Sequence, residues 1–259
     1  MKPLPLAVFV TSGALVGSSF LMIKVLVEDL NPTLVVAARL FLGALVALVV
    51  VRALGLPMLK ARASYVVVFL VGSLGLALPY VAVAWGTTRV SSGSTAVLNA
   101  SMPIVTACLA VWLLPDERLT PSKVTGLVAG FIGVAFLSGG HFVDLGSRAL
   151  VGDLALIGAV LCFSIAAVCL RRFVRDENAL TVAAFILLFA ALVSAPIALL
   201  TEPPARLSIL DEAQWVALIT LGVATGLTSL MFYWLIARIG AMKASMNAYL
   251  MPATGVLLG

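Results

Sequence analysis

The sequence predicts an all-α protein, a polytopic membrane helix bundle made of two inverted five-helix repeats. Hydrophobic residues make up 63% of the 259 residues and charged residues only 10%, and the mean hydropathy is +1.19. A soluble domain of this size could not bury so much apolar surface, so the chain must use lipid as its solvent. Apolar segments long enough to cross a bilayer recur along the chain, and one residue pattern occurs twice.

Nine apolar segments have about the 20 residues that a helix needs to cross the hydrocarbon core of a bilayer. They are separated by short stretches that carry turn and charge signals, among them 28–32, 115–118 and 171–178. Because the connections are short, we expect successive helices to be antiparallel neighbours. The predicted spans are 5–27, 33–51, 64–85, 93–114, 121–139, 151–170, 179–200, 213–236 and 242–259.

A pattern of Trp, Arg, Met and Pro occurs twice at a spacing of 149 residues. Five spans separate the copies, and an odd number of crossings inverts the second copy relative to the first, as in many secondary transporters. We therefore predict a first five-helix repeat over 1–140 and a second over 150–259. Coincidence is the alternative, because few positions match. The members are Trp85, Arg89, Met102 and Pro103 in the first copy and Trp234, Arg238, Met251 and Pro252 in the second.

The second repeat is predicted to lack its last helix in this chain. Only seven residues follow Pro252, whereas Pro103 is followed by the rest of its helix, a turn and the whole 121–139 span. The duplicated unit should have ten helices, of which nine are present here. We expect about 30 further residues in the native protein, which is enough for a tenth helix.

Lysine and arginine gather in alternate loops. With the N-terminus in the cytoplasm, eleven basic residues fall on the cytoplasmic side and three, Arg89, Arg148 and Arg206, on the other. Cytoplasmic loops of membrane proteins carry such an excess. The sequence therefore predicts a multi-pass protein of the cytoplasmic (inner) membrane with a cytoplasmic N-terminus. The eleven are Lys2, Arg52, Lys60, Arg62, Arg118, Lys123, Arg171, Arg172, Arg175, Arg238 and Lys243.

Several functions have no support in the sequence. The net charge of +5 comes from basic residues scattered through the loops, whereas nucleic acid binding requires a basic stripe. Cys108, Cys162 and Cys169 lie inside apolar spans, and His141 has no ligand partners nearby. We predict no enzyme activity, no cofactor and no metal site. The expected partners are a small-molecule substrate and the lipid bilayer, and a homodimer is left open.

The sequence resembles EamA-type carriers of the drug/metabolite transporter superfamily. The similarity rests on 75–80 (GLALPY) followed by Trp85-Gly86, on 98–103 (LNASMP), on 114–119 (LPDERL), on the spacing of Gly126, Gly130 and Gly133, and on 244–252 (ASMNAYLMP). Lys24 and Arg39, near the ends of the first two spans, agree with it. The resemblance implies two inverted five-helix halves, a central substrate cavity and alternating access. Val16-Gly17 departs from the Trp-Gly that is frequent in the family.

Two asparagines precede prolines inside apolar spans. A proline removes a backbone donor and frees a carbonyl one turn earlier, and an amide in the bilayer needs a partner. Asn99 and Asn247 are predicted substrate contacts at mid-membrane, with an interhelical hydrogen bond as the equal alternative. Pro79, Pro103 and Pro252 are predicted helix breaks that allow gating.

Aromatic residues supply the other candidate contacts. Tyr80, Tyr233 and Tyr249 offer stacking surface and hydroxyl groups to a substrate. Trp85 and Trp234 are predicted to line the cavity because the repeat places them together, and interfacial anchoring is the alternative for both. Six residues are expected to converge near the pseudo-two-fold axis: Tyr80, Trp85, Asn99, Trp234, Asn247 and Tyr249.

Charged residues near the span ends have two interpretations. Lys24 is a candidate substrate contact, because a cation in the outer part of a carrier attracts carboxylates. The alternative for both Lys24 and Arg39 is snorkelling to the outer interface or pairing with the acidic residues at 28–29. The acidic pair Asp116-Glu117 is interpreted as a solvated turn that starts the next helix.

We expect a secondary transporter that exports a small polar metabolite, with amino acids as the substrate class that the resemblance implies. A carrier for amphipathic cations or drugs and a non-transporting membrane scaffold are the alternatives. A proton-driven carrier commonly places a carboxylate inside the membrane, but all eleven acidic residues fall in loops or at span ends. Asp153, the deepest, is expected in the first turn of its helix. The sequence thus predicts transport without a buried carboxylate.

Overall fold

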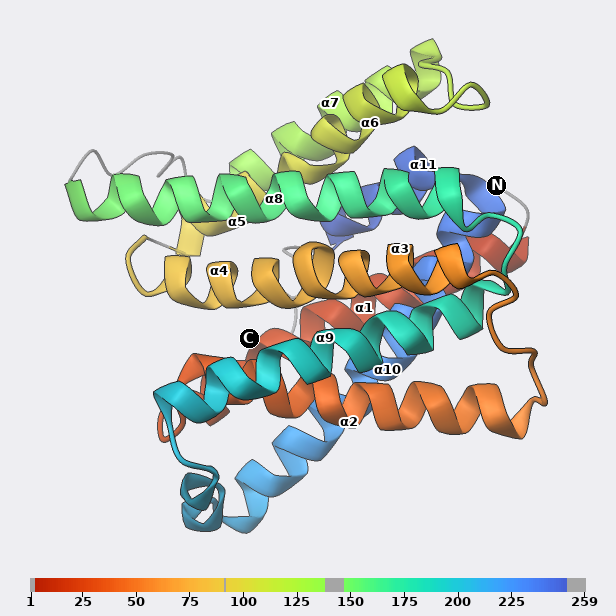
Figure 1. Ribbon diagram of the computed structural model, residues 1–259. Coiled ribbons are helices and arrows are strands. Elements are labelled where there is room, and N and C mark those ends of the chain that lie inside the picture. The colour runs from red at the N-terminus through yellow and green to blue at the C-terminus, as the bar shows by residue number, and fades with distance from the viewer. Residues whose placement is uncertain (1–2, 91, 138–146, 251–259) are drawn as a thin grey trace.

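The computed structural model describes residues 3–90, 92–137 and 147–250, and these residues are mostly helical (Figure 1). They contain no strand, so the all-α prediction is confirmed. The chain also has a π-helix (Ser73–Ala77) and two short 3-10 helices (Pro204–Ile209 and Met246–Tyr249). The α-helices are α1 (Pro3–Leu26), α2 (Pro32–Ala53), α3 (Arg62–Gly72), α4 (Leu78–Thr87), α5 (Ser92–Ala100), α6 (Met102–Leu113), α7 (Pro121–Leu137), α8 (Ser147–Phe173), α9 (Ala179–Thr201), α10 (Glu212–Ile239) and α11 (Ala241–Ser245).

Among the described residues, six helical segments are long and apolar enough to cross a bilayer, and they match predicted spans to within a few residues. The helices α1 and α7 contribute two shorter apolar stretches. The chain is therefore a multi-pass membrane protein. Residues 251–259 of the last predicted span lie outside the described residues. The six segments are Pro32–Ala53, Arg62–Thr87, Ser94–Leu113, Leu150–Phe173, Ala179–Thr201 and Glu212–Ile239.

Proline accompanies a break in two of the spans. Pro79 has no N–H with which to continue an α-helix, and the π-helix before it ends in a hydrogen bond from the Leu78 N–H to the carbonyl of Ser73. Pro103 stands at the start of α6, which Ser101 separates from α5. Irregular backbone is tolerated at membrane depth where protein covers it, and both prolines are buried.

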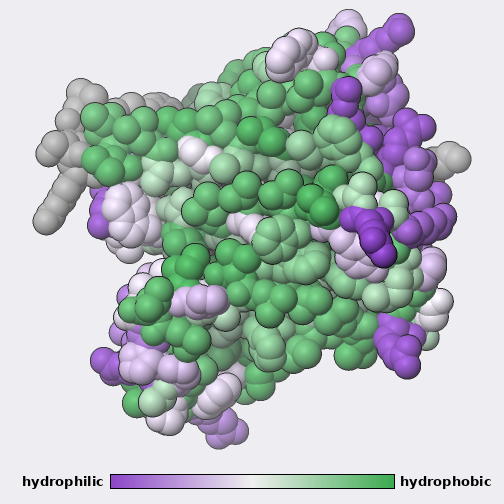
Figure 2. Space-filling model, in the orientation of Figure 1, coloured by the Kyte–Doolittle hydropathy of each residue, from purple (hydrophilic) through white to green (hydrophobic). Residues whose placement is uncertain are grey.

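The loops lie at two ends of the bundle (Figure 1). We name one the basic end; it is on the right of Figure 1 and holds the loops 54–61, 114–120 and 174–178. The opposite end holds 27–31 and 202–211. The first half begins at the basic end with α1 and the second begins at the opposite end with α8, so the halves are inverted. Figure 2 shows an apolar belt between hydrophilic side chains, which are dense at the basic end.

Most of the helix packing joins one half to the other. The helix α2 lies against α9 and α10, α1 lies against α10, and α4 and α6 lie against α8. The expectation that successive helices are neighbours is wrong for α1 and α2 and for α8 and α9, which share few contacts among the described residues. The buried core therefore runs through the interface between the halves, where it includes Leu40, Val68, Ala107, Ala167 and Leu187.

In each half, the loop after the first helix contacts the start of a helix in the other half. In the α8–α9 loop, Glu177 accepts hydrogen bonds from backbone N–H groups and from Ser64 Oγ at the start of α3. In the α1–α2 loop, Asp29 Oδ2 accepts a 2.6 Å hydrogen bond from Gln214 Nε2 at the start of α10. Burial raises the pKa of Glu177, and the hydrogen bonds to its carboxylate lower it. The hydrogen bonds have the larger combined effect, so the pKa lies below its usual value. Each half thus holds the start of a long span of the other.

Candidate substrate site

Arg39 places a cation at the interface between the two halves. Its Nε donates a 3.1 Å hydrogen bond to Thr225 Oγ1 in α10, and the Thr225 hydroxyl itself donates to the carbonyl of Leu221 at 2.7 Å. Thr225 lies about 20 Å along α10 from its start, at a rise of 1.5 Å per residue. The interpretation that Arg39 snorkels to the outer interface or pairs with the acidic turn is therefore wrong, because its guanidinium is bonded to the middle of a spanning helix.

Two aromatic rings complete this group, which we call the Arg39 site: Arg39, Tyr80, Phe163 and Thr225. The Arg39 guanidinium carbon is 4.8 Å from the centroid of the Tyr80 ring. The Tyr80 and Phe163 rings are 5.7 Å apart in an edge-to-face arrangement. The site thus combines α2 and α4 of the first half with α8 and α10 of the second. Tyr80 follows the π-helix and Pro79 directly, so the irregular stretch of backbone leads into this site.

The positive charge of Arg39 has no counter-ion among the described residues. Within the described part of the chain, no carboxylate lies within 4.0 Å of Arg39. A guanidinium has five N–H donors, and only the Nε donor has a hydrogen-bond partner among these residues. A basic residue at the centre of a membrane span costs about 3 kcal/mol, and Arg39 is half-buried in such a span. A ring face and one hydroxyl offset only part of that cost.

The structure does not bring the six predicted residues together around one cavity. Asn247 is buried, and its amide donates to the carbonyl of Phe9 at 2.7 Å and to Ser12 Oγ at 2.9 Å, both in α1. The amide of the half-buried Asn99 donates to the carbonyl of Thr95, one turn earlier. The bonds from Asn247 to α1 are the interhelical hydrogen bonds that the sequence offered as the alternative to substrate contact.

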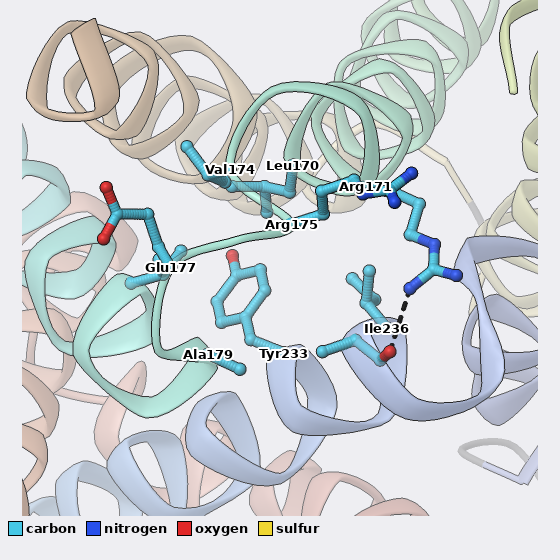
Figure 3. A pocket seen from close by; sticks show the side chains of 10 residues that line it. Leu170, Arg171, Val174, Arg175, Glu177, Ala179, Tyr233 and Ile236 are labelled. Carbon is cyan, nitrogen blue, oxygen red and sulfur yellow. Dashed lines mark hydrogen bonds between the residues drawn. The ribbon is translucent and has the colours of Figure 1, made fainter. Parts of the chain in front are cut away.

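The predicted tyrosines lie in three places. Tyr80 belongs to the Arg39 site. Tyr249 donates a 3.0 Å hydrogen bond to the carbonyl of Leu127, and its ring lies against Gly130 in α7. Tyr233 is buried and lines a recess near the basic end, between α8, α9 and α10 (Figure 3).

Each predicted tryptophan is stacked with the arginine four residues later. The Arg89 guanidinium lies 3.5 Å from the Trp85 ring centroid, and the Arg238 guanidinium lies 5.5 Å from that of Trp234. The first pair stands near the opposite end of the bundle and the second near the basic end. Aromatic rings at this level are typical interfacial anchors, so the repeated pattern places one such pair near each end.

Two predicted residues fall outside what the structure describes. Pro252 lies beyond the described residues, and so does the side chain of Lys24. Their predicted roles stay predictions. Pro79 and Pro103 occupy the helix breaks that the sequence predicts for them.

Glu117 corrects the interpretation of the acidic turn. It is 6% exposed, and its carboxylate accepts hydrogen bonds from the backbone N–H groups of Ala241, at 2.5 Å, and Met242, at 3.3 Å. It therefore caps the start of α11 in the other half, whereas the sequence suggested a solvated turn. Its neighbour Asp116 forms a 2.7 Å ion pair with Arg171, and that hydrogen bond holds the pKa of Asp116 below its usual value.

One acidic side chain inside a span has a buried oxygen without a partner among the described residues. Asp153 is the seventh residue of α8, so it lies in the second turn and not in the first turn expected for it. Its Oδ1 is buried and has no hydrogen-bond partner in the described part of the chain. The residue stands near the opposite end of the apolar Leu150–Phe173 segment.

Sequence reasoning missed the Arg39 site and the buried role of Glu117. The available signal for the site was the depth of Arg39: it and Lys24 are the basic residues furthest inside apolar spans. Nothing in the sequence pointed to Phe163 or Thr225, because an apolar ring and a threonine are ordinary residues of a membrane helix.

Comparisons with known proteins agree with this architecture. The model of the EamA-like transporter family matches the chain twice, over residues 4–139 and 150–259. Two relatives from Bacillus subtilis (strain 168) are named "Uncharacterized transporter YoaV" and "Uncharacterized transporter YyaM". Each is 27% identical to the chain, over 244 residues (94% of the chain, 83% of YoaV) and 250 residues (93% of the chain, 80% of YyaM).

A solved structure shares the fold. It is described only as a crystal structure of a protein, and it superimposes with a TM-score of 0.81 over 96% of this chain and 85% of its own. The sequence identity is 21%, so this likeness concerns the fold alone.

Proposed function

Because the chain belongs to the EamA-like transporter family and is a membrane transporter, we propose that it exports a small polar metabolite, such as an amino acid, by alternating access at the Arg39 site. The observation that carries the proposal is the position of Arg39, a half-buried cation at the junction of α2 and α4 with α8 and α10. In transporters built from inverted repeats, substrate sites lie near the bilayer midplane at the repeat interface.

Contacts between the halves at both ends support alternating access. At the basic end, Glu177 and Glu117 each hold a helix start of the other half. At the opposite end, Asn31 N–H donates to Glu202 Oε2 at 2.8 Å, and the hydroxyls of Thr33 and Thr201 are 2.6 Å apart. Opening one end at a time would break one set of contacts while the other set keeps the halves together.

The two alternatives fit the Arg39 site less well. A carrier for amphipathic cations needs a carboxylate at its binding site, whereas this site presents a positive charge that repels a cation. A scaffold without transport has no use for an arginine with unpaired donors in the membrane, because an apolar residue at that position costs less free energy. An exporter of metabolites uses both the charge and the central position.

Reconstituted vesicles test the proposed function. The purified protein should equilibrate labelled amino acids across the membrane faster than empty vesicles do, and a saturating unlabelled substrate should slow that flux. Equal rates in vesicles with and without protein, for all twenty amino acids, would refute amino acid transport. A ligand screen by thermal shift would then identify other small metabolites, because a ligand that binds the folded state raises its stability.

The orientation can be tested with single cysteines. We expect the basic end to face the cytoplasm, because basic loops are retained there. The two test substitutions are Lys60→Cys and Ala205→Cys, at exposed positions of opposite ends, in a background without the three native cysteines. An impermeant thiol reagent added to intact cells should label position 205 and should label position 60 only after lysis. The reverse pattern would invert the topology.

Transport should not depend on Asp153. We expect flux down the substrate gradient without a pH gradient, because this side chain stands near a span end, ten residues or about 15 Å along α8 from Phe163 of the Arg39 site. The Asp153→Asn variant should keep its initial transport rate within about twofold, consistent with an isosteric change at a peripheral position. Uphill accumulation driven by a pH gradient in the wild type, and lost in Asp153→Asn, would identify Asp153 as a proton carrier instead.

A further inference from the structure

We propose that the Arg39 site binds the carboxylate of a small organic anion whose body is apolar or aromatic. The proposal rests on the proposed transport function and revises its substrate class: among small polar metabolites, it favours carboxylates without an ammonium group over amino acids. It assigns the charged end of the substrate to Arg39 and the apolar end to the rings of Tyr80 and Phe163.

The guanidinium of Arg39 is held so that its terminal nitrogens remain available. The Nε bond to Thr225 fixes one edge of the group, and the Thr225 hydroxyl cannot swing away because it also donates to the Leu221 carbonyl. Both terminal nitrogens lack a hydrogen-bond or ion-pair partner among the described residues. A carboxylate fits such a planar pair of donors with two parallel hydrogen bonds.

The apolar side of the site comes from the two rings. Tyr80 and Phe163 are both half-buried and pack against the main hydrophobic core. Because both rings are only partly buried, part of their surface stays accessible, and a flat or branched apolar group beside the guanidinium can cover it. A substrate with a carboxylate at one end and an apolar body at the other matches both parts.

The absence of a nearby carboxylate among the described residues argues against a positive charge on the substrate. An ammonium group would need an acceptor carboxylate, and none lies near Arg39 in the described part of the chain. A monoanion instead neutralises Arg39, so the loaded site carries no net charge. A neutral pair is less costly than a lone arginine at membrane depth, which favours binding of an anion in the closed protein.

Binding by four matched probes at pH 7.5 tests the proposal: phenylacetate, phenylacetamide, phenylethylamine and phenylalanine. They share the aromatic body and differ in charge. At 10 mM, phenylacetate should raise the Tm of the purified protein by about 3 °C. Phenylacetamide should have no effect, and phenylethylamine and phenylalanine, which carry an ammonium group, should give smaller shifts than phenylacetate. Equal shifts from the acid and the amide, or a shift from the amine alone, would overturn the assignment. So would the absence of any shift with phenylacetate.

Two variants locate the binding. Arg39→Gln removes the charge without leaving an unpaired cation in the membrane, so the protein should fold, and the response to phenylacetate should disappear. Arg39→Lys keeps the charge but loses the paired donors, and we expect affinity at least tenfold lower than in the wild type. The matched control is Arg89→Gln, an arginine that also lies over an aromatic ring but outside the site; its response should equal that of the wild type.

The outcomes separate the two proposals. A phenylacetate response that persists in Arg39→Gln overturns the Arg39 assignment. Flux in vesicles is measured independently with labelled phenylacetate and with labelled amino acids, so transport can be confirmed while the Arg39 assignment fails. Loss of the response in Arg89→Gln as well as in Arg39→Gln would show a general effect of surface charge, and would also overturn the assignment.

Discussion

Replacing Gly226 by valine should remove most of the folded protein. A Cβ atom at position 226 would lie 2.8 Å from the carbonyl oxygen of Gly43 and 2.9 Å from Val46 Cβ. The first neighbour is backbone and cannot move unless α2 and α10 separate. Overpacking of this kind costs about 1–3 kcal/mol or more, and such a loss changes the amount of folded protein several-fold. The yield of monodisperse protein after gel filtration, with its Tm, measures the effect.

The matched control is Gly158→Val in α8. A Cβ atom at position 158 has no neighbour within 4 Å, so the variant makes the same chemical change in open space. It should keep the yield and the Tm of the wild type, within the few tenths of a kcal/mol expected from helix propensity. If Gly226→Val were as stable as Gly158→Val, the close approach of α2 and α10 would be wrong.

Replacing Glu117 by alanine should destabilise the basic end. The substitution leaves the buried N–H groups of Ala241 and Met242 without their acceptor, and a buried unsatisfied donor costs about 1–3 kcal/mol. A cost of that size shifts an equilibrium between closed and open arrangements by about 10- to 100-fold. We expect a lower Tm and a transport rate reduced by about tenfold.

Two further variants distinguish the effect of the hydrogen bonds between Glu117 and α11 from the effect of removing a negative charge in this loop. Glu117→Gln keeps one acceptor oxygen and should recover much of the stability that Glu117→Ala loses. Asp116→Asn removes only the exposed ion pair with Arg171, and exposed pairs contribute about 0–1 kcal/mol, so its Tm should change little. Equal effects of Glu117→Ala and Asp116→Asn would show that the buried cap does not hold α11.

The sequence was sufficient for the spans but not for their partners. Hydropathy is a local property, and each long apolar segment could be read from it. Packing could not, because lipid-facing and core-facing side chains are equally apolar: in α2, exposed Phe41 follows fully buried Leu40. No pattern therefore showed that α2 would lie against α9 and α10.

The Arg39 site could not be predicted either, because its residues come from helices that are far apart in the sequence. Thr225 is 186 residues from Arg39, and the acceptors of the Asn247 amide are more than 230 residues away. A single sequence carries no sign of such pairings. What it did show was an arginine within an apolar span, and the structure explains that arginine by bringing together helices of both halves.

The π-helix of the first half has no counterpart in the described residues of the second half, and this difference has an energetic consequence. The span Arg62–Thr87 and the helix α10 correspond at the 149-residue spacing, but the first is interrupted at Ser73–Ala77 and before Pro79, whereas α10 runs unbroken over 28 residues. In the proposed alternating-access cycle, two identical inverted halves would make the inward-facing and outward-facing states equivalent by a two-fold rotation, with equal free energy. A compliant span on one side and a stiff helix on the other remove that degeneracy. The empty carrier should then rest predominantly in one of its two facing states.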